Sequence, residues 1–129
     1  MIHNLGSKTY IASLLGADSR NASANGTGFD LQGSNDAEGE AIVILDSEAG
    51  SGTSPTLDVK LQESANNSDW SDISGATFTQ VTDAAAAFEK ISINTNDVAR
   101  YVRAVGTSGG TTPVFVYAVS LVYSKKYGN

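Results

Sequence analysis

The sequence has no cysteine and a single histidine, His3, which lies close to the N-terminus. Without cysteine there can be no disulfide bond, no thiolate metal site and no cysteine nucleophile. A serine–histidine–carboxylate triad would need His3, and residues near a chain end are often poorly ordered. The glycine-rich stretches do not continue into a phosphate-binding loop, and no complete calcium-binding loop is present. We therefore expect a protein that is not an enzyme and that has no cofactor and no bound metal.

Charged residues are scarce, at 17% of the chain, and the formal net charge is −6. Phosphate binding requires concentrated lysine and arginine, so nucleic acid is not an expected partner. No apolar run reaches the length of a membrane span and the N-terminal stretch lacks a signal-peptide pattern, so we expect no membrane contact and synthesis in the cytoplasm. Acidic residues concentrate in the middle of the chain and basic residues toward its end, which favours attraction between copies or to a shell of mixed charge.

From Ala41 onward, short β-branched and aromatic runs alternate with clusters of glycine, serine, asparagine and threonine, which is typical of an all-β sandwich or barrel. In residues 57–62 apolar and polar residues alternate strictly, as in a strand with one buried face. We predict a single-domain antiparallel β-sandwich of about eight strands, with a jelly-roll order. Gly109–Gly110 is expected to form a hairpin turn between the last two strands. The expected strands are 9–15, 29–32, 41–46, 56–64, 77–82, 89–94, 99–107 and 114–124.

The first forty residues are weakly patterned. They contain one apolar island, which includes Tyr10 and Ile11, and then a long polar stretch from Gly16 to Gly28 that is typical of a loop. The chain is therefore divided into an irregular N-terminal arm and loop, residues 1–28, and a β-sandwich domain, residues 29–129.

Two of the expected strands, 41–45 and 114–124, are apolar on both faces. Only one face of each sheet in a two-layer sandwich meets the core, so the other apolar face needs a loop, another layer or another subunit to cover it. We interpret the excess as a contact between subunits, and cover by the first forty residues is the alternative. The predicted interface residues are Ile42, Ile44, Phe115, Tyr117, Val119, Leu121 and Tyr123.

Aromatic and basic residues are candidates for binding a sugar or a nucleic acid. Trp70 and the five tyrosines are residues that can form a platform for a sugar ring, although Trp70, shortly before Ile73, is more typical of a packed side chain. Arg100 and Arg103 flank Tyr101 and make too small a basic patch for specific nucleic-acid contact. We expect these arginines to pair with acidic residues of a neighbouring strand or subunit.

Between residues 29 and 126 the successive strand sequences are informative as a set. They are FDLQG at 29–33, EAIVILD at 40–46, TLDVKLQES at 56–64, WSDI at 70–73, ATFTQV at 76–81 and RYVRAV at 100–105. This succession resembles the small β-sandwich structural proteins encoded among the head genes of tailed bacteriophages. The first 28 residues do not carry the resemblance.

The resemblance implies a capsid decoration, or cement, protein: a symmetric oligomer on the exterior of a virion, made in the host cytoplasm and bound to the major capsid protein. We expect a homotrimer, with a homodimer as the alternative. An apolar N-terminal segment is expected to order on docking to the shell. The residues of this predicted capsid contact are Ile2, Leu5, Lys8, Tyr10 and Ile11. Other candidate functions are a phage tail or baseplate module that contacts a receptor, and a carbohydrate-binding β-sandwich.

Overall fold

The computed structural model describes residues 9–125, and every regular element in this range is a β-strand. The strands are β1 (Tyr10–Arg20), β2 (Ala24–Asn25), β3 (Phe29–Asp30), β4 (Ala37–Ser47), β5 (Ser51–Ser64), β6 (Ser71–Thr77), β7 (Ala87–Asn94) and β8 (Tyr101–Lys125). All pairings between them are antiparallel. The described part of the chain contains no helix that is long and apolar enough to cross a membrane.

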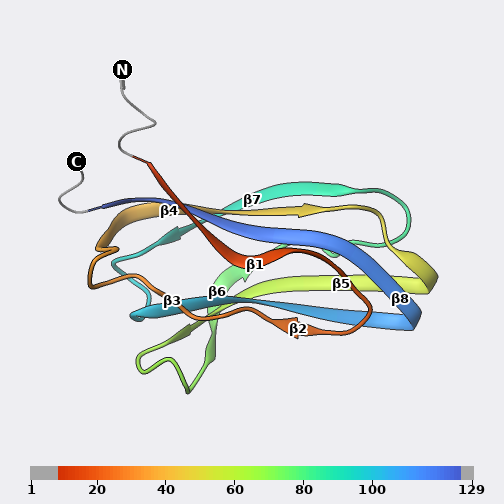
Figure 1. Cartoon of the computed structure of the whole chain (residues 1–129), viewed down its shortest axis with the longest axis horizontal. Coiled ribbons are helices and arrows are strands. Elements are labelled where there is room, and N and C mark those ends of the chain that lie inside the picture. The colour runs from red at the N-terminus through yellow and green to blue at the C-terminus, as the bar shows by residue number, and fades with distance from the viewer. Residues whose placement is uncertain (1–8, 126–129) are drawn as a thin grey trace.

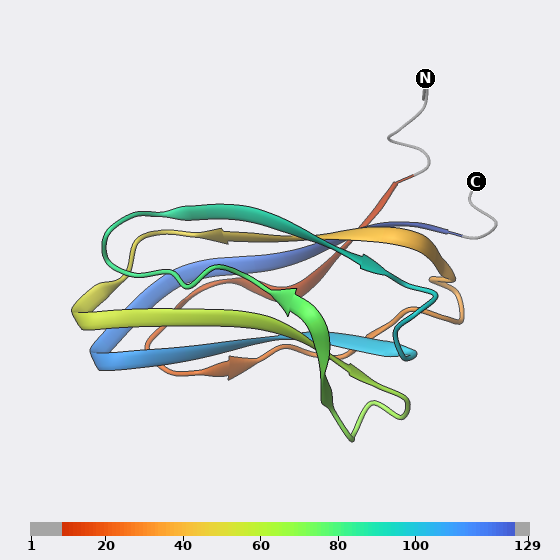
Figure 2. The ribbon, with the colours of Figure 1, turned by 180° about the vertical axis from the view of Figure 1, so that it is seen from behind.

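The strands form two layers, which Figures 1 and 2 show from opposite sides. In sheet A, the C-terminal half of β8 pairs with β1 on one side and with β4 on the other, and β4 also pairs with β7. In sheet B, the N-terminal half of β8 pairs with β2 and β3 on one side and with β5 on the other, and β5 also pairs with β6. With β8 counted in both sheets and β2 and β3 taken as one interrupted strand, this order is that of a jelly roll. The predicted single-domain antiparallel sandwich is confirmed.

β8 passes from sheet B to sheet A at Gly109 and Gly110, at one end of the molecule (Figure 1). Gly110 has a φ of 99°, which favours glycine, and a Cβ there would lie 2.5 Å from the backbone oxygen of Ser54. β5 bends alongside β8 and pairs with it on both sides of this corner. The predicted hairpin is therefore wrong, because the two halves of β8 lie in different sheets and pair with other strands.

The N-terminal segment is part of the sandwich from Tyr10 onward. β1 pairs with β8 over its whole length, and Leu14 and Leu15 are buried in the core. Register shifts on both sides of Leu15 interrupt the regular alternation of this strand, so its sequence does not have a clear period of two. This corrects the predicted division at residue 28, because the described part of the proposed arm belongs to the domain.

The strand predicted at 77–82 is displaced. β6 ends at Thr77, and beyond it Val81 alone forms a bridge, to Leu57 of β5. The backbone N–H of Phe78 donates to the carbonyl of Val59, so this irregular segment still follows β5. Phe78 and Val81 are both buried, which is why the sequence there has the apolar character of a strand.

The core lies between the sheets. Inward and outward residues of β5 alternate as predicted, and Leu57, Val59 and Leu61 are fully buried. The alternate residues Ala41, Val43 and Leu45 of β4 meet them from sheet A.

Five residues predicted to form an oligomer interface belong to this core. They are 0–6% exposed: Phe115, Tyr117, Val119, Leu121 and Tyr123. A side chain that is buried within its own chain has no surface left for a partner, so this part of the interface prediction is wrong. Gly50 and Gly106 make room for the largest rings, since a Cβ at these positions would collide with Phe115 and Tyr117, respectively.

Candidate functional site

The described part of the chain has several surfaces that are candidates for binding a partner. It contains no group of three or more histidine, cysteine, aspartate or glutamate residues that could hold a metal ion. The two carboxyl groups with lowered pKa values, Asp30 and Asp72, are both held by side chains of the same chain. The candidate sites are therefore a pocket at one end of the sandwich and the outer faces of the two sheets.

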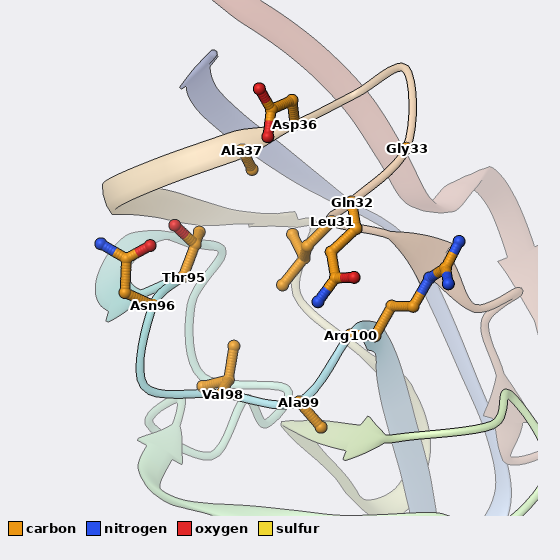
Figure 3. Close-up of a pocket in the computed structure, with 10 residues that line it drawn as sticks. All are labelled: Leu31, Gln32, Gly33, Asp36, Ala37, Thr95, Asn96, Val98, Ala99 and Arg100. Carbon is orange, nitrogen blue, oxygen red and sulfur yellow. The ribbon is translucent and has the colours of Figure 1, made fainter. Parts of the chain in front are cut away.

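The pocket has a volume of about 430 Å³ and lies between the β3–β4 and β7–β8 connections (Figure 3). Its one cationic side chain, Arg100, turns away from the other lining residues and donates from Nε and Nη2 to the Asp30 carboxylate, both at 2.9 Å. These hydrogen bonds lower the pKa of Asp30. The Thr95 hydroxyl donates to the carbonyl of Gly39 at 2.8 Å. Arg100 and Thr95 thus link the β7–β8 connection to β3 and β4.

The outer face of sheet A, which we call the outer A face, carries apolar side chains interspersed with serine and charged residues. Strand register places Ile11 of β1 opposite Val122 of β8, and Val122 opposite Ile42 of β4, so one apolar row crosses three strands. The next row contains Ile44, and Phe88 and Val116 lie farther along the strands. The apolar residues of the outer A face are Ile11, Ile42, Ile44, Phe88, Val116 and Val122.

Three of these side chains are markedly exposed: Ile11 by 75%, Phe88 by 79% and Val116 by 39%. Ile42, Ile44 and Val122 are half-buried by their neighbours on the sheet. β1 lies beside β8 as an edge strand and does not cross over the face, so the alternative expectation of cover by the N-terminal segment is not met within the described residues. Exposed apolar patches on a protein surface are often contact sites.

Two charged residues lie within the same surface. Lys90 of β7 is opposite Ile44, and Asp46 of β4 is opposite Phe88, so both side chains point outward with the apolar residues. Both are exposed, and neither forms a hydrogen bond or ion pair with another described residue. Glu40 has the same outward parity on β4, and Glu48 lies beside Asp46 and Val116, so the outer A face carries Lys90 and several carboxylates among its apolar groups.

The outer face of sheet B, the outer B face, is different because its polar side chains bind one another. Asp72 accepts a hydrogen bond from Gln62 at 2.9 Å and forms a 3.0 Å ion pair with Lys60. These contacts, with the Gln62 hydrogen bond the larger effect, lower the pKa of Asp72. Arg103 donates from Nε and Nη2 to the Gln62 side-chain oxygen, at 3.0 and 2.8 Å. These polar side chains of the outer B face thus have hydrogen-bond partners within the chain.

Trp70 is part of the outer B face. The guanidinium carbon of Arg103 lies 4.5 Å from the centre of its ring system, and a Cβ on Gly28 would lie 2.9 Å from the indole edge. The ring is half-buried between these groups. A sugar platform requires an open ring face, and the cation occupies one side of this one.

The predicted contacts of Arg100 and Arg103 are met in part. Arg100 pairs with Asp30 on the neighbouring strand, as expected. Arg103 binds an amide and an indole rather than an acidic residue.

The predicted capsid-contact residues separate into three groups. Ile2, Leu5 and Lys8 lie outside the described residues. The ring of Tyr10 packs against Tyr123 at 5.7 Å, and the ammonium of Lys125 lies 4.4 Å from it. Ile11 points to the other side of β1 and belongs to the outer A face, together with the predicted interface residues Ile42 and Ile44.

Sequence reasoning did not single out Phe88 as a surface residue. The signal was present in the sequence, because apolar Ile91 and Ile93 alternate with Lys90 and Ser92, and Phe88 falls on the same side of the strand as Lys90. Phe88 lies beside a hollow of about 290 Å³ lined by Ile44, Phe88, Glu89 and Lys90.

No family model matches the chain, and no curated protein matches its sequence. Among solved structures, the SPBc2 prophage-derived protein YomS is 11% identical, with a TM-score of 0.47 over 89% of this chain and 93% of that one. The VP2 subviral particle of infectious bursal disease virus is 14% identical, with a TM-score of 0.51 over 92% of this chain. Dimeric latent PorU from Porphyromonas gingivalis is 10% identical, with a TM-score of 0.51 over 91% of this chain. This chain spans only 32% of the VP2 chain and 12% of the PorU chain, and these similarities concern the fold alone.

Proposed function

We propose that this chain is a virion structural protein, and that it decorates the exterior of a capsid by binding the major capsid protein. The observation that carries the proposal is the exposed apolar surface of a sandwich whose described residues contain no group of three or more potential metal ligands. Such a protein acts through contact area. The resemblance of its strand sequences to head proteins of tailed phages supports this role, and the jelly-roll fold is compatible with it.

Decoration stabilises a shell by mass action. A protein that binds intact shells, and loses its contacts when neighbouring subunits separate, adds its binding free energy to the work of opening the shell. Contacts to several subunits at once increase this effect, because each further contact forms at high effective concentration. A β-sandwich with a fully packed core suits this role, since it transmits strain with little deformation.

The test uses shells assembled from major capsid protein alone. The full-length chain is added to them, and bound protein is measured by co-sedimentation and by electron microscopy of the particles. We expect regular occupancy of symmetry-related positions and a raised melting temperature of the shell. Absence of binding contradicts the proposal, and a few copies at one vertex of a complete particle would instead indicate the tail or baseplate module.

The predicted shell contact needs a narrower test than removal of the whole N-terminal segment. A deletion that extends into β1 removes Leu14 and Leu15 from the core and is expected to unfold the domain. Deletion of residues 1–8 leaves all described strands in place, and the triple substitution of Ile2, Leu5 and Lys8 by alanine is the matched variant. We expect both to lose shell binding and to retain the circular dichroism spectrum of the native protein; normal binding would assign the shell contact to another surface.

A further inference from the structure

We propose that the outer A face binds the outer A face of a second copy of this chain, in a face-to-face contact about a two-fold axis. The inference rests on the proposed function for its biological setting, because it assigns the outer A face to the assembly of the decorating protein and leaves the shell contact to the N-terminal segment. A two-fold contact favours the dimer over the trimer among the two expected oligomers, since a trimer requires two different patches on each copy.

The first argument is the apolar surface itself. Ile11, Val122 and Ile42 form a row across three strands, and Ile44 and Phe88 extend it toward β7. Two sheets that face each other with apolar residues bury them as the two layers of the sandwich do. Burial of such groups is the main favourable contribution to association.

The second argument is the arrangement of charge. Lys90 and Asp46 lie on adjacent strands, two residue positions apart in register, and neither has a partner among the described residues. In a two-fold contact each copy supplies both residues, so each Lys90 can pair with the Asp46 of the other copy. Glu40 and Glu48 lie farther along the same face, so this complementarity concerns the region around Ile44 and Phe88, where Lys90 and Asp46 lie.

The third argument is shape. The Phe88 ring is 79% exposed and stands beside the hollow lined by Ile44, Glu89 and Lys90. A projecting ring and a hollow on one surface provide both halves of an interlocking contact when two copies meet. The large aromatic residue at such a position is typical of the side chains that dominate interface energy.

The size of the face sets the strength of the contact. Four strands about 4.8 Å apart and about seven residues long, at ~3.4 Å per residue, give a flat area of roughly 300 Å². A standard interface buries about 800 Å² of accessible surface per partner. We therefore expect a weak, reversible dimer in solution, which becomes stable on a shell because bound copies are held at high local concentration.

The experiment is sedimentation velocity of the full-length chain from about 1 µM to about 1 mM. We expect the wild type to shift from monomer to dimer over this range, and Ile44→Asp to raise the dissociation constant at least tenfold. Val105→Asp is the matched control, because Val105 is a half-buried, outward-facing β-branched residue of the outer B face. A wild type that stays monomeric, or an Ile44→Asp variant that associates like Val105→Asp, overturns the proposal.

Charge reversal gives the specific test of the two-fold pairing. Lys90→Asp replaces the lysine of the proposed pair by a second carboxylate, and Asp46→Lys replaces the carboxylate by a second lysine, so each variant alone is expected to remain monomeric. A mixture of the two variants is expected to form a heterodimer, and the double variant K90D/D46K is expected to regain the wild-type dissociation constant. Failure of the mixture and of the double variant to associate, with both folded, would exclude this pairing.

Shell binding is measured separately on the same variants. A protein that decorates shells but does not self-associate retains the proposed function and loses this inference. A protein that dimerises through Ile44 and does not bind shells retains the inference and loses the proposed function.

Discussion

On the outer B face, Lys60, Gln62 and Arg103 bind Asp72, one another and Trp70, so that each polar side chain has its partner within the chain. On the outer A face, Lys90 and Asp46 have no partner among the described residues, and large apolar side chains lie exposed around them. Both faces are made by the outward-pointing residues of regular strands in the same sandwich. The strand period fixes which residues point outward, and the chemistry of those residues decides whether a face is complete or needs a second molecule.

The largest expected effect is a difference in unfolding free energy between substitutions on the inner and outer sides of β4. Leu45→Ala is expected to lower the free energy of unfolding by about 3 kcal/mol, because Leu45 is fully buried and its removal leaves a cavity. Ile44→Ala, one residue away on the outer A face, is expected to cost less than about 1 kcal/mol in the monomer. Urea unfolding at low protein concentration measures both. Equal losses would mean that Ile44 is a core residue and that the outer A face is not free.

The next effect concerns the outer B face. Arg103→Ala removes two hydrogen bonds to Gln62 and the cation above Trp70, and is expected to lower the free energy of unfolding by about 1.5 kcal/mol. Trp70 fluorescence is expected to shift to longer wavelength as water reaches the ring. Lys90→Ala is the control, with an expected change within about 0.5 kcal/mol in the monomer. A control as damaging as Arg103→Ala would remove the distinction between the faces.

A smaller effect comes from the layer between the two faces. The Tyr117 hydroxyl is buried without a hydrogen-bond partner among the described residues, and burial raises the pKa of the group. Tyr117→Phe is therefore expected to raise the free energy of unfolding by about 1 kcal/mol, since a buried polar group without a partner is destabilising. Tyr123→Phe is the comparison, because the Tyr123 hydroxyl donates to Asn35 at 3.4 Å, and we expect no gain there. Thermal unfolding followed by circular dichroism measures the difference.

The smallest expected effect is the loss of domain stability at acidic pH. Hydrogen bonds from Arg100 lower the pKa of Asp30, and Gln62 and Lys60 lower that of Asp72. A lowered pKa in the folded state contributes stability that is present above the ordinary carboxyl value, near pH 4, and is lost as the pH falls through the lowered value. The domain is thus expected to lose stability below about pH 4, and Asp30→Asn with Asp72→Asn to make that loss less steep. An unchanged slope in acid unfolding would show that other carboxyl groups are responsible.

The fold was largely predictable because several strands have one clear period. In residues 57–62, apolar and polar residues alternate without exception, and the inward set is fully buried as expected. In residues 114–124 both sets are apolar, so alternation identifies the strand but not which face meets the core. The structure places the aromatic set inside, where Gly50 and Gly106 leave space for Phe115 and Tyr117. Contacts between distant residues of this kind are not encoded in local periodicity.

The candidate site was predictable only in part for the same reason. Ile42 and Ile44 were identified correctly as outward residues of a strand with two apolar faces. Their neighbours Ile11 and Phe88 come from strands that pair across long stretches of sequence, and the bulges in β1 hide its alternation. The glycine pair at Gly109–Gly110 was a correct signal of a sharp bend, but a turn within one sheet and a corner between two sheets use the same residues.

β8 has a further consequence, since its 25 residues supply a central strand to each layer. One sheet cannot unfold without removing β8 from the other sheet. Partial unfolding that begins in the middle of the domain therefore has a high free-energy cost. We expect the amide protons of β8 to be the slowest to exchange with solvent, and the two layers to melt in one cooperative transition. A force applied to one layer would reach the other along covalent backbone rather than through side-chain packing alone.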